Sequence, residues 1–125
     1  MILVDYIKFL VIYIVIDMVW VIGAGKMHSN MVETVQKKPL KVNLLAASLY
    51  YLMAPLLYIF VIKPYAKTTS DVLKIAITCS LLMFGTFDLT NRAIFQDYSW
   101  SYTAMDISWG VFSITLACFL TYKIK

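Results

Sequence analysis

Apolar residues along this chain fall into four long runs that are separated by short polar segments. Each run has roughly the 20 residues that an α-helix needs to cross the hydrocarbon core of a bilayer. The runs predict membrane-spanning helices at about residues 4–25, 43–62, 72–95 and 102–122. Because the connections between them are short, neighbouring helices should be antiparallel. The pattern therefore predicts an all-α, polytopic membrane protein, with residues 1–125 forming one antiparallel four-helix transmembrane bundle.

Local signals refine the ends and the shape of these helices. Pro55 lies inside the second run and predicts a kink, whose freed backbone groups the surrounding protein must satisfy. Ser70 or Asp71 is the expected N-cap of the third helix, because TTSD directly precedes the apolar run. The longest connection, KMHSNMVETVQKKPLKV, holds either a short interfacial helix over residues 30–36 or a plain polar loop.

The composition places the chain in a lipid bilayer. Hydrophobic residues make up 62% of it and charged residues 14%, against about 45–50% and about 25% in soluble domains. A water-soluble fold of this size could not bury so much apolar surface. Asp5 and Asp17 are unsuited to a cleaved signal peptide, so the first run is interpreted as a retained span of a multi-pass protein.

The charged residues indicate neither a nucleic-acid partner nor an orientation. The formal net charge of +4 comes from scattered lysines, which suit lipid headgroups better than nucleic acid. If both termini lie on one side of the membrane, that side carries six basic residues and the other side five, so the positive-inside rule selects neither orientation. The six are Lys8, Lys63, Lys67, Lys74, Lys123 and Lys125, and the five are Lys26, Lys37, Lys38, Lys41 and Arg92.

Residue types that build familiar catalytic or metal sites are scarce. His28 is the only histidine, and the two cysteines, Cys79 and Cys118, lie inside apolar runs as small packing residues. The sequence holds no recognisable nucleophile, metal-ligand set or cofactor-binding loop. No catalytic residue, metal or cofactor is therefore expected.

Three aspartates interrupt the apolar runs, and a hydrogen-bond donor follows each of them three residues later. The segments are DMVW at 17–20, DLTN at 88–91 and DISW at 106–109. Positions i and i+3 share a helix face, so each donor should project from the same side of its helix as its carboxylate. At 1.5 Å per residue, the predicted helix ends place the three carboxylates within roughly 6 Å of one depth.

These aspartates are expected to face the protein interior, because an aspartate at the bilayer centre costs about 2.5–3.5 kcal/mol. Arg92 lies four residues after Asp88 and is the expected ion-pair partner. The candidate polar-core or ligand-binding residues are Asp17, Trp20, Asp88, Asn91, Arg92, Asp106 and Trp109.

This polar layer has three functional interpretations. The first is a protein that binds or transports a cation, a proton or a small cationic solute, acting as a homo-oligomer because four short helices enclose little volume. The second is a structural or assembly protein whose interhelical hydrogen bonds, each worth about 0.6–2 kcal/mol, only hold the helices together. The third is an intramembrane enzyme that acts on a lipid or an amine with the carboxylates as acid and base. Three acids opposed by one arginine favour the first.

The combination of FDLTN, DISWG and DMVW resembles a bacterial family of small membrane proteins, domain of unknown function 2177. Its members typically carry YDLTN, D-x-x-WG and an early D-x-x-W. The resemblance extends over essentially the whole chain and implies the same four-span layout, with no known activity, substrate or cofactor. Phe87 stands where a tyrosine is usual, which removes a hydroxyl next to the aspartates, and Arg92 stands where the family tends to be apolar.

Overall fold

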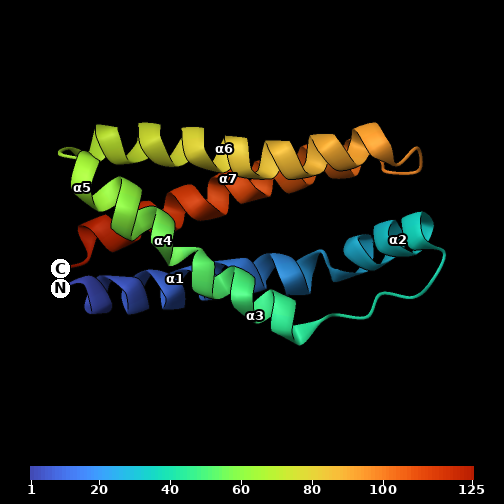
Figure 1. The fold of residues 1–125 in the computed structure, drawn as a ribbon, viewed down its shortest axis with the longest axis horizontal. Helices are drawn as coiled ribbons and strands as arrows, with labels where there is room; N and C mark the ends of the chain where they lie inside the picture. Colours follow the sequence, from blue (N-terminus) through green and yellow to red (C-terminus); the bar gives the residue numbers. More distant parts are fainter.

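Four helical segments run back and forth along one axis in the computed structural model, which describes residues 1–125 (Figure 1). The segments are α1 (Ile2–Gly23), the interrupted segment Leu44–Tyr65, α6 (Thr69–Ile94) and α7 (Trp100–Lys123). Three of them are long and apolar enough to cross a membrane, and α1 together with α2 (Gly25–Gln36) makes a fourth if this bent pair is one span. The protein is an all-helical, polytopic membrane protein, as the sequence predicts.

The first helix turns sharply before the long connection. Ala24 separates α1 from α2, and the two helix axes differ in direction by 69°. Of the two alternatives for this connection, the helix is the one present, and it begins at Gly25 rather than at residue 30. It ends at Lys37, whose φ of 58° is the left-handed conformation that commonly terminates a helix. Residues 38–43 then return the chain to the next span.

The second span is interrupted at Pro55, where the sequence predicts a kink. It consists of α3 (Leu44–Met53), α4 (Pro55–Leu57), the π-helical turn η1 (Tyr58–Ile62) and α5 (Lys63–Tyr65). Proline has no N–H group, so carbonyls in the preceding turn lose helical partners. The Tyr6 hydroxyl on α1 donates to the Leu52 carbonyl over 2.5 Å, and so the neighbouring helix satisfies the break.

A capping box starts α6. Thr68 is its N-cap: the Thr68 hydroxyl accepts from the Asp71 N–H over 3.1 Å, and the Asp71 carboxylate accepts from the Thr68 N–H over 2.9 Å. The expectation that Ser70 or Asp71 is the N-cap is therefore wrong. Asp71 occupies the third helical position, from which its carboxylate reaches back to the start of the helix.

Small residues bring α6 and α7 close together. Ala76 and Ser80 on α6, and Ser113 and Ala117 on α7, are fully buried. A side chain added at Gly110 would place its Cβ only 2.2 Å from Phe84 Cγ, so the aromatic ring lies directly against the glycine backbone. Close approach of backbones through small side chains is the usual way in which helices associate in a bilayer, where apolar side chains gain nothing by leaving lipid.

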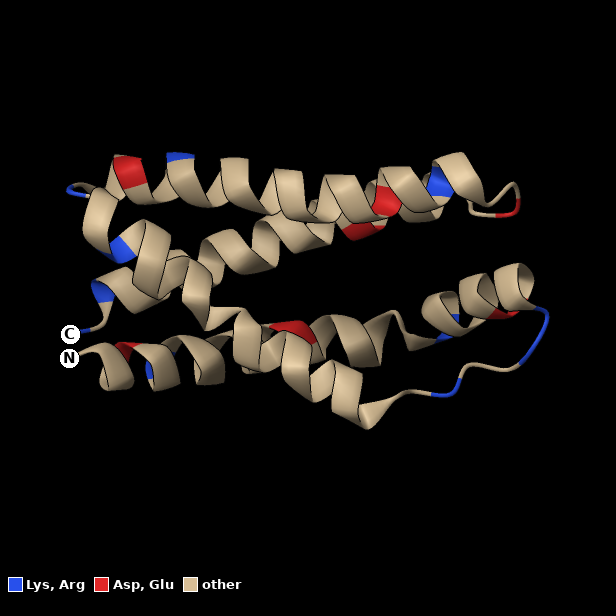
Figure 2. Cartoon of the chain, viewed as in Figure 1, with Lys and Arg blue, Asp and Glu red and all other residues tan.

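The two ends of the chain meet at one end of the molecule (Figure 1). Asp5 accepts from Lys63 over 2.5 Å and lies 3.4 Å from Lys8, and the Lys8 ammonium also donates to the Ile124 carbonyl over 2.7 Å. Figure 2 shows the lysines and arginine gathered towards the two ends of the helices, whereas several acidic residues lie further in. Large apolar side chains such as Ile22 and Leu82 are exposed along the outer surface, where acyl chains would cover them.

Candidate functional site

Asp17 on α1 connects three helical segments. The Tyr51 hydroxyl on α3 donates to one of its carboxylate oxygens, and the Trp109 indole N–H on α7 donates to the other over 3.1 Å. Both donors are neutral, so they stabilise the carboxylate without cancelling its charge. Asp17 is half-buried and faces the interior between these helices.

Asp88 on α6 is fully buried and only partly satisfied. The Tyr98 hydroxyl, from the connection between α6 and α7, donates to Asp88 Oδ1 over 2.5 Å. The second oxygen, Oδ2, is buried and has no hydrogen-bond partner. Buried polar atoms almost always have a partner, so an orphaned carboxylate oxygen marks a group that lacks a proton, a donor or a ligand.

Asp106 on α7 lies beside Asp88, within hydrogen-bonding reach of its carboxyl group. Two carboxylates that meet away from water repel each other, and the repulsion is relieved when one proton lies between them. Asp106 itself is half-buried, whereas Asp88 is completely enclosed. Asp106 is therefore the member of the pair that an incoming group can reach.

Two of the three aspartates lie next to each other, and the third is separate from this pair. Asp88 and Asp106 adjoin, whereas Asp17 makes no hydrogen bond to either of them. Trp109 links the two parts, because it follows Asp106 by three residues on α7 and donates to Asp17 on α1. All three side chains point into the protein, as expected for aspartates within membrane helices.

No hydrogen bond joins an aspartate to the donor that follows it three residues later on its own helix. Trp109 donates to Asp17 across the helix interface and not to Asp106, and the Trp20 indole N–H is buried without a partner. Asn91 lies beside Tyr98, and Tyr98 is the donor to Asp88. Residues i and i+3 do share a face, but a large indole extends away from its own helix and reaches the next one.

The expected ion pair between Asp88 and Arg92 is wrong. The Arg92 guanidinium lies over the ring of Trp100, with its central carbon 4.9 Å from the ring centroid, and its Nε atom has no partner. The ion pairs of the protein involve Asp5 and Asp97 instead. Arg92 lies one turn nearer the end of α6 than Asp88, and its guanidinium makes a cation–π contact there. No lysine or arginine therefore pairs with Asp17, Asp88 or Asp106.

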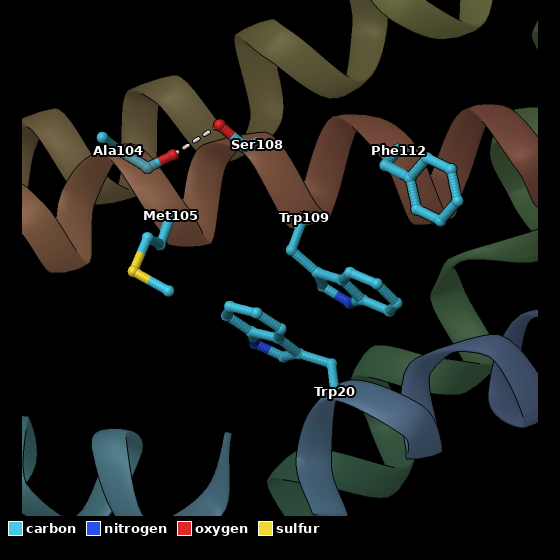
Figure 3. A pocket seen from close by; sticks show the side chains of 6 residues that line it. All are labelled: Trp20, Ala104, Met105, Ser108, Trp109 and Phe112. Atoms are coloured by element: carbon cyan, nitrogen blue, oxygen red, sulfur yellow. Dashed lines mark hydrogen bonds between the residues drawn. The ribbon is translucent and has the colours of Figure 1, made fainter. Parts of the chain in front are cut away.

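An open cavity of 530 Å³ adjoins this polar region. Its walls are mostly aromatic and aliphatic, and two carboxylates, Asp17 and Asp106, belong to them. Trp20 and Trp109 stack on one side with ring centroids 5.2 Å apart and planes inclined by only 8° (Figure 3). His28 on α2 packs edge-on against Trp20, and its Nδ1 atom is 2.7 Å from the Tyr102 hydroxyl.

A known family pattern covers the spans that carry the aspartates and the two stacked tryptophans. The family model described as "Predicted membrane protein (DUF2177)" matches residues 2–123. The chain belongs to this family. The resemblance carried by the FDLTN, DISWG and DMVW segments is thus confirmed. No curated protein and no solved structure matches the chain.

The structure also adds two residues, Tyr98 and His28, to those expected from the motifs of the DUF2177 family. From its sequence position near the end of a span, Tyr98 resembles the aromatic residues that lie at the membrane interface. It contacts Asp88 because the connection between α6 and α7 folds back. His28 lies on α2, where the 69° bend brings it against Trp20. Phe87, in contrast, points outwards with 60% of its surface exposed. The hydroxyl next to Asp88 therefore comes from Tyr98, at a position that spacing within a helix does not reveal.

Proposed function

We propose that this membrane protein binds and transports a cation, either a proton, an inorganic ion or a small cationic solute, at Asp17, Asp88 and Asp106. One observation carries the proposal: none of these three inward-facing acids is paired with a lysine or an arginine. Uncompensated carboxylates at membrane depth are costly, and such residues typically mark ion or proton pathways.

The hydrogen bonds of the site support the same conclusion. Asp17 accepts only from neutral donors, and one oxygen of the fully buried Asp88 accepts from none. A network that served packing alone would be satisfied more cheaply by asparagine or serine, because a buried charge is destabilising unless it is neutralised. A bound cation or proton would supply the missing charge.

An open cavity gives access to two of the three acids, which supports transport rather than a purely structural role. Asp17 and Asp106 belong to the wall of the open cavity, and so do Gly25, His28 and Ser29 of α2 and Leu40 of the following linker. Because α2 bends away from α1, this part of the wall lies at one end of the bundle (Figure 1). A path through the whole bilayer would require a second copy of the chain, and we propose a homo-oligomer.

Flux measurements in proteoliposomes test the proposal. Vesicles that contain the wild-type protein should show proton or alkali-cation flux above protein-free vesicles, and Asp106→Asn and Asp88→Asn should abolish it. Asp97→Asn is the matched control, because Asp97 is an exposed acid that pairs with Lys37 and does not belong to the cavity wall. Equal flux in the wild type, all variants and protein-free vesicles would refute transport.

A structural role is the second candidate, and the contacts of Asp17 favour it. This one carboxylate holds side chains from α3 and α7 against α1. If the role is purely structural, Asp17→Asn and Asp106→Asn will insert and fold, and will change stability without altering any flux. A loss of flux in correctly folded Asp106→Asn protein would exclude this candidate.

A further inference from the structure

We infer that the 530 Å³ cavity bordered by Asp17, Asp106, Trp20 and Trp109 accepts an organic ammonium ion, an amine that carries an aryl or alkyl group. The inference rests on the proposed cation binding and assigns the class of cation. Its failure leaves proton or inorganic-ion transport intact.

The size and lining of the cavity favour an organic solute over a metal ion. Its volume falls within the range of about 300–1,000 Å³ that is typical of small-molecule sites. Its lining is mostly apolar, with rings from Tyr13, Trp20, Tyr50, Phe84 and Trp109. Divalent cations such as Ca²⁺ and Mg²⁺ require several oxygen ligands at about 2.0–2.6 Å, and no group of three or more metal-binding side chains occurs in the protein.

The two carboxylates and the aromatic rings complement the two ends of an organic ammonium ion. Asp17 carries negative charge on α1, and Asp106 on α7 belongs to a carboxyl pair that keeps one negative charge when it shares a proton. No lysine or arginine pairs with either residue. The faces of indole and phenol rings attract ammonium groups and the alkyl carbons next to them. The wall of this cavity thus contains both acidic groups and aromatic rings.

The stacked tryptophans separate this cavity from a second, outer pocket. Trp20 and Trp109 belong to the walls of both, and the outer pocket of 410 Å³ is completed by Ala104, Met105, Ser108 and Phe112 of α7 (Figure 3). The aromatic group of a ligand in the inner cavity would lie against the tryptophan wall, and its ammonium group would face the aspartates.

Asp88 lies next to the cavity through its neighbour Asp106. Asp88 is fully buried and does not belong to the cavity wall, whereas its neighbour Asp106 does. An ammonium group bound at Asp106 would place a positive charge next to both carboxyl groups. That charge would reduce the repulsion between the two acids.

A matched pair of probes tests the inference. 2-Phenylethylammonium chloride and the neutral 2-phenylethanol have nearly the same shape and differ in the charged group. Ligand-detected NMR titrations of the detergent-purified full chain should show that the ammonium ion binds about tenfold more tightly than the alcohol. Equal affinity for the two probes, or no saturable binding of the ammonium ion, would overturn the inference.

Variants locate the binding within the cavity. Asp106→Asn should remove the preference for the ammonium ion, and Trp20→Leu should weaken its binding several-fold while Asp97→Asn leaves it unchanged. If Asp106→Asn fails to fold, Trp20→Leu still decides, because unchanged affinity in that variant would overturn the inference. If no ammonium ion binds but aspartate-dependent proton or alkali-cation flux persists in vesicles, the ligand class is wrong and the proposed function stands.

Discussion

Replacing Gly110 by alanine should destabilise the contact between α6 and α7. The added Cβ would lie 2.2 Å from Phe84 Cγ and 2.4 Å from both Cδ atoms. Carbon atoms in contact are normally about 3.5–4.0 Å apart, so the two groups must separate by about 1.3–1.8 Å. The Cγ atom is held directly by the Phe84 Cβ, and a rotation of the ring about its own axis therefore does not relieve the clash.

The magnitude follows from two opposing effects. Overpacking of this kind costs about 1–3 kcal/mol, whereas replacing a glycine inside a helix by alanine gains about 0.5–1 kcal/mol. Gly85→Ala on α6 is the matched control, because a Cβ at Gly85 meets nothing within 4 Å. Gly110→Ala should thus have a free energy of unfolding about 1–3 kcal/mol below that of Gly85→Ala.

Equilibrium unfolding in mixed micelles with increasing sodium dodecyl sulfate, followed by circular dichroism, measures this difference. In a Phe84→Ala background the ring is absent, and Gly110→Ala should then be neutral or stabilising. If Gly110→Ala proves as stable as Gly85→Ala in the otherwise unchanged protein, the close approach of Phe84 to the α7 backbone is refuted.

Three further changes test the hydrogen bonds by the same unfolding measurement. Asp17→Ala leaves two donors from neighbouring helices without an acceptor and should cost about 1–3 kcal/mol for each, whereas Asp17→Asn keeps an acceptor oxygen and should cost less. Tyr98→Phe removes the hydroxyl that donates to Asp88 and should lower the free energy of unfolding by about 1–3 kcal/mol. Thr68→Ala removes the acceptor of the capping box at the start of α6 and should cost about 1 kcal/mol.

Two control substitutions distinguish the loss of these hydrogen bonds from a nonspecific loss of stability. Tyr65→Phe removes a hydroxyl from an exposed tyrosine, and Ser70→Ala changes an exposed residue two positions after the true N-cap. Both should leave the free energy of unfolding nearly unchanged. A loss in Ser70→Ala equal to that in Thr68→Ala would contradict the assignment of the cap, and equal losses in the two tyrosine variants would contradict the role of Tyr98.

The all-helical membrane fold could be predicted from the sequence because it depends on properties that are local in the chain. The length of each apolar run matches the thickness of the bilayer, and the missing N–H group of Pro55 disrupts its helix in any surroundings. The inward orientation of the aspartates follows from the cost of exposing them to lipid.

The partners of those aspartates could not be predicted, because they depend on how far each side chain extends across a helix interface. The spacing rule for i and i+3 describes one isolated helix, whereas the indole of Trp109 spans the interface to Asp17. Arg92 had two neighbours within reach, and the ring of Trp100 holds it rather than Asp88. Tyr98 reaches Asp88 only because the connection between α6 and α7 folds back over the helix ends.

The contact between the Lys8 ammonium and the Ile124 carbonyl has a consequence for how the protein is assembled during synthesis. With both ends of the chain side by side, a short peptide could join them, and the resulting ring could be reopened at residues 38–42. The rearranged chain would begin with α3 and end with α2, so the helices would enter the bilayer in a new order. If the rearranged chain still formed the same interior, the contacts between the inserted helices would determine this architecture. The order in which the helices enter the bilayer would not.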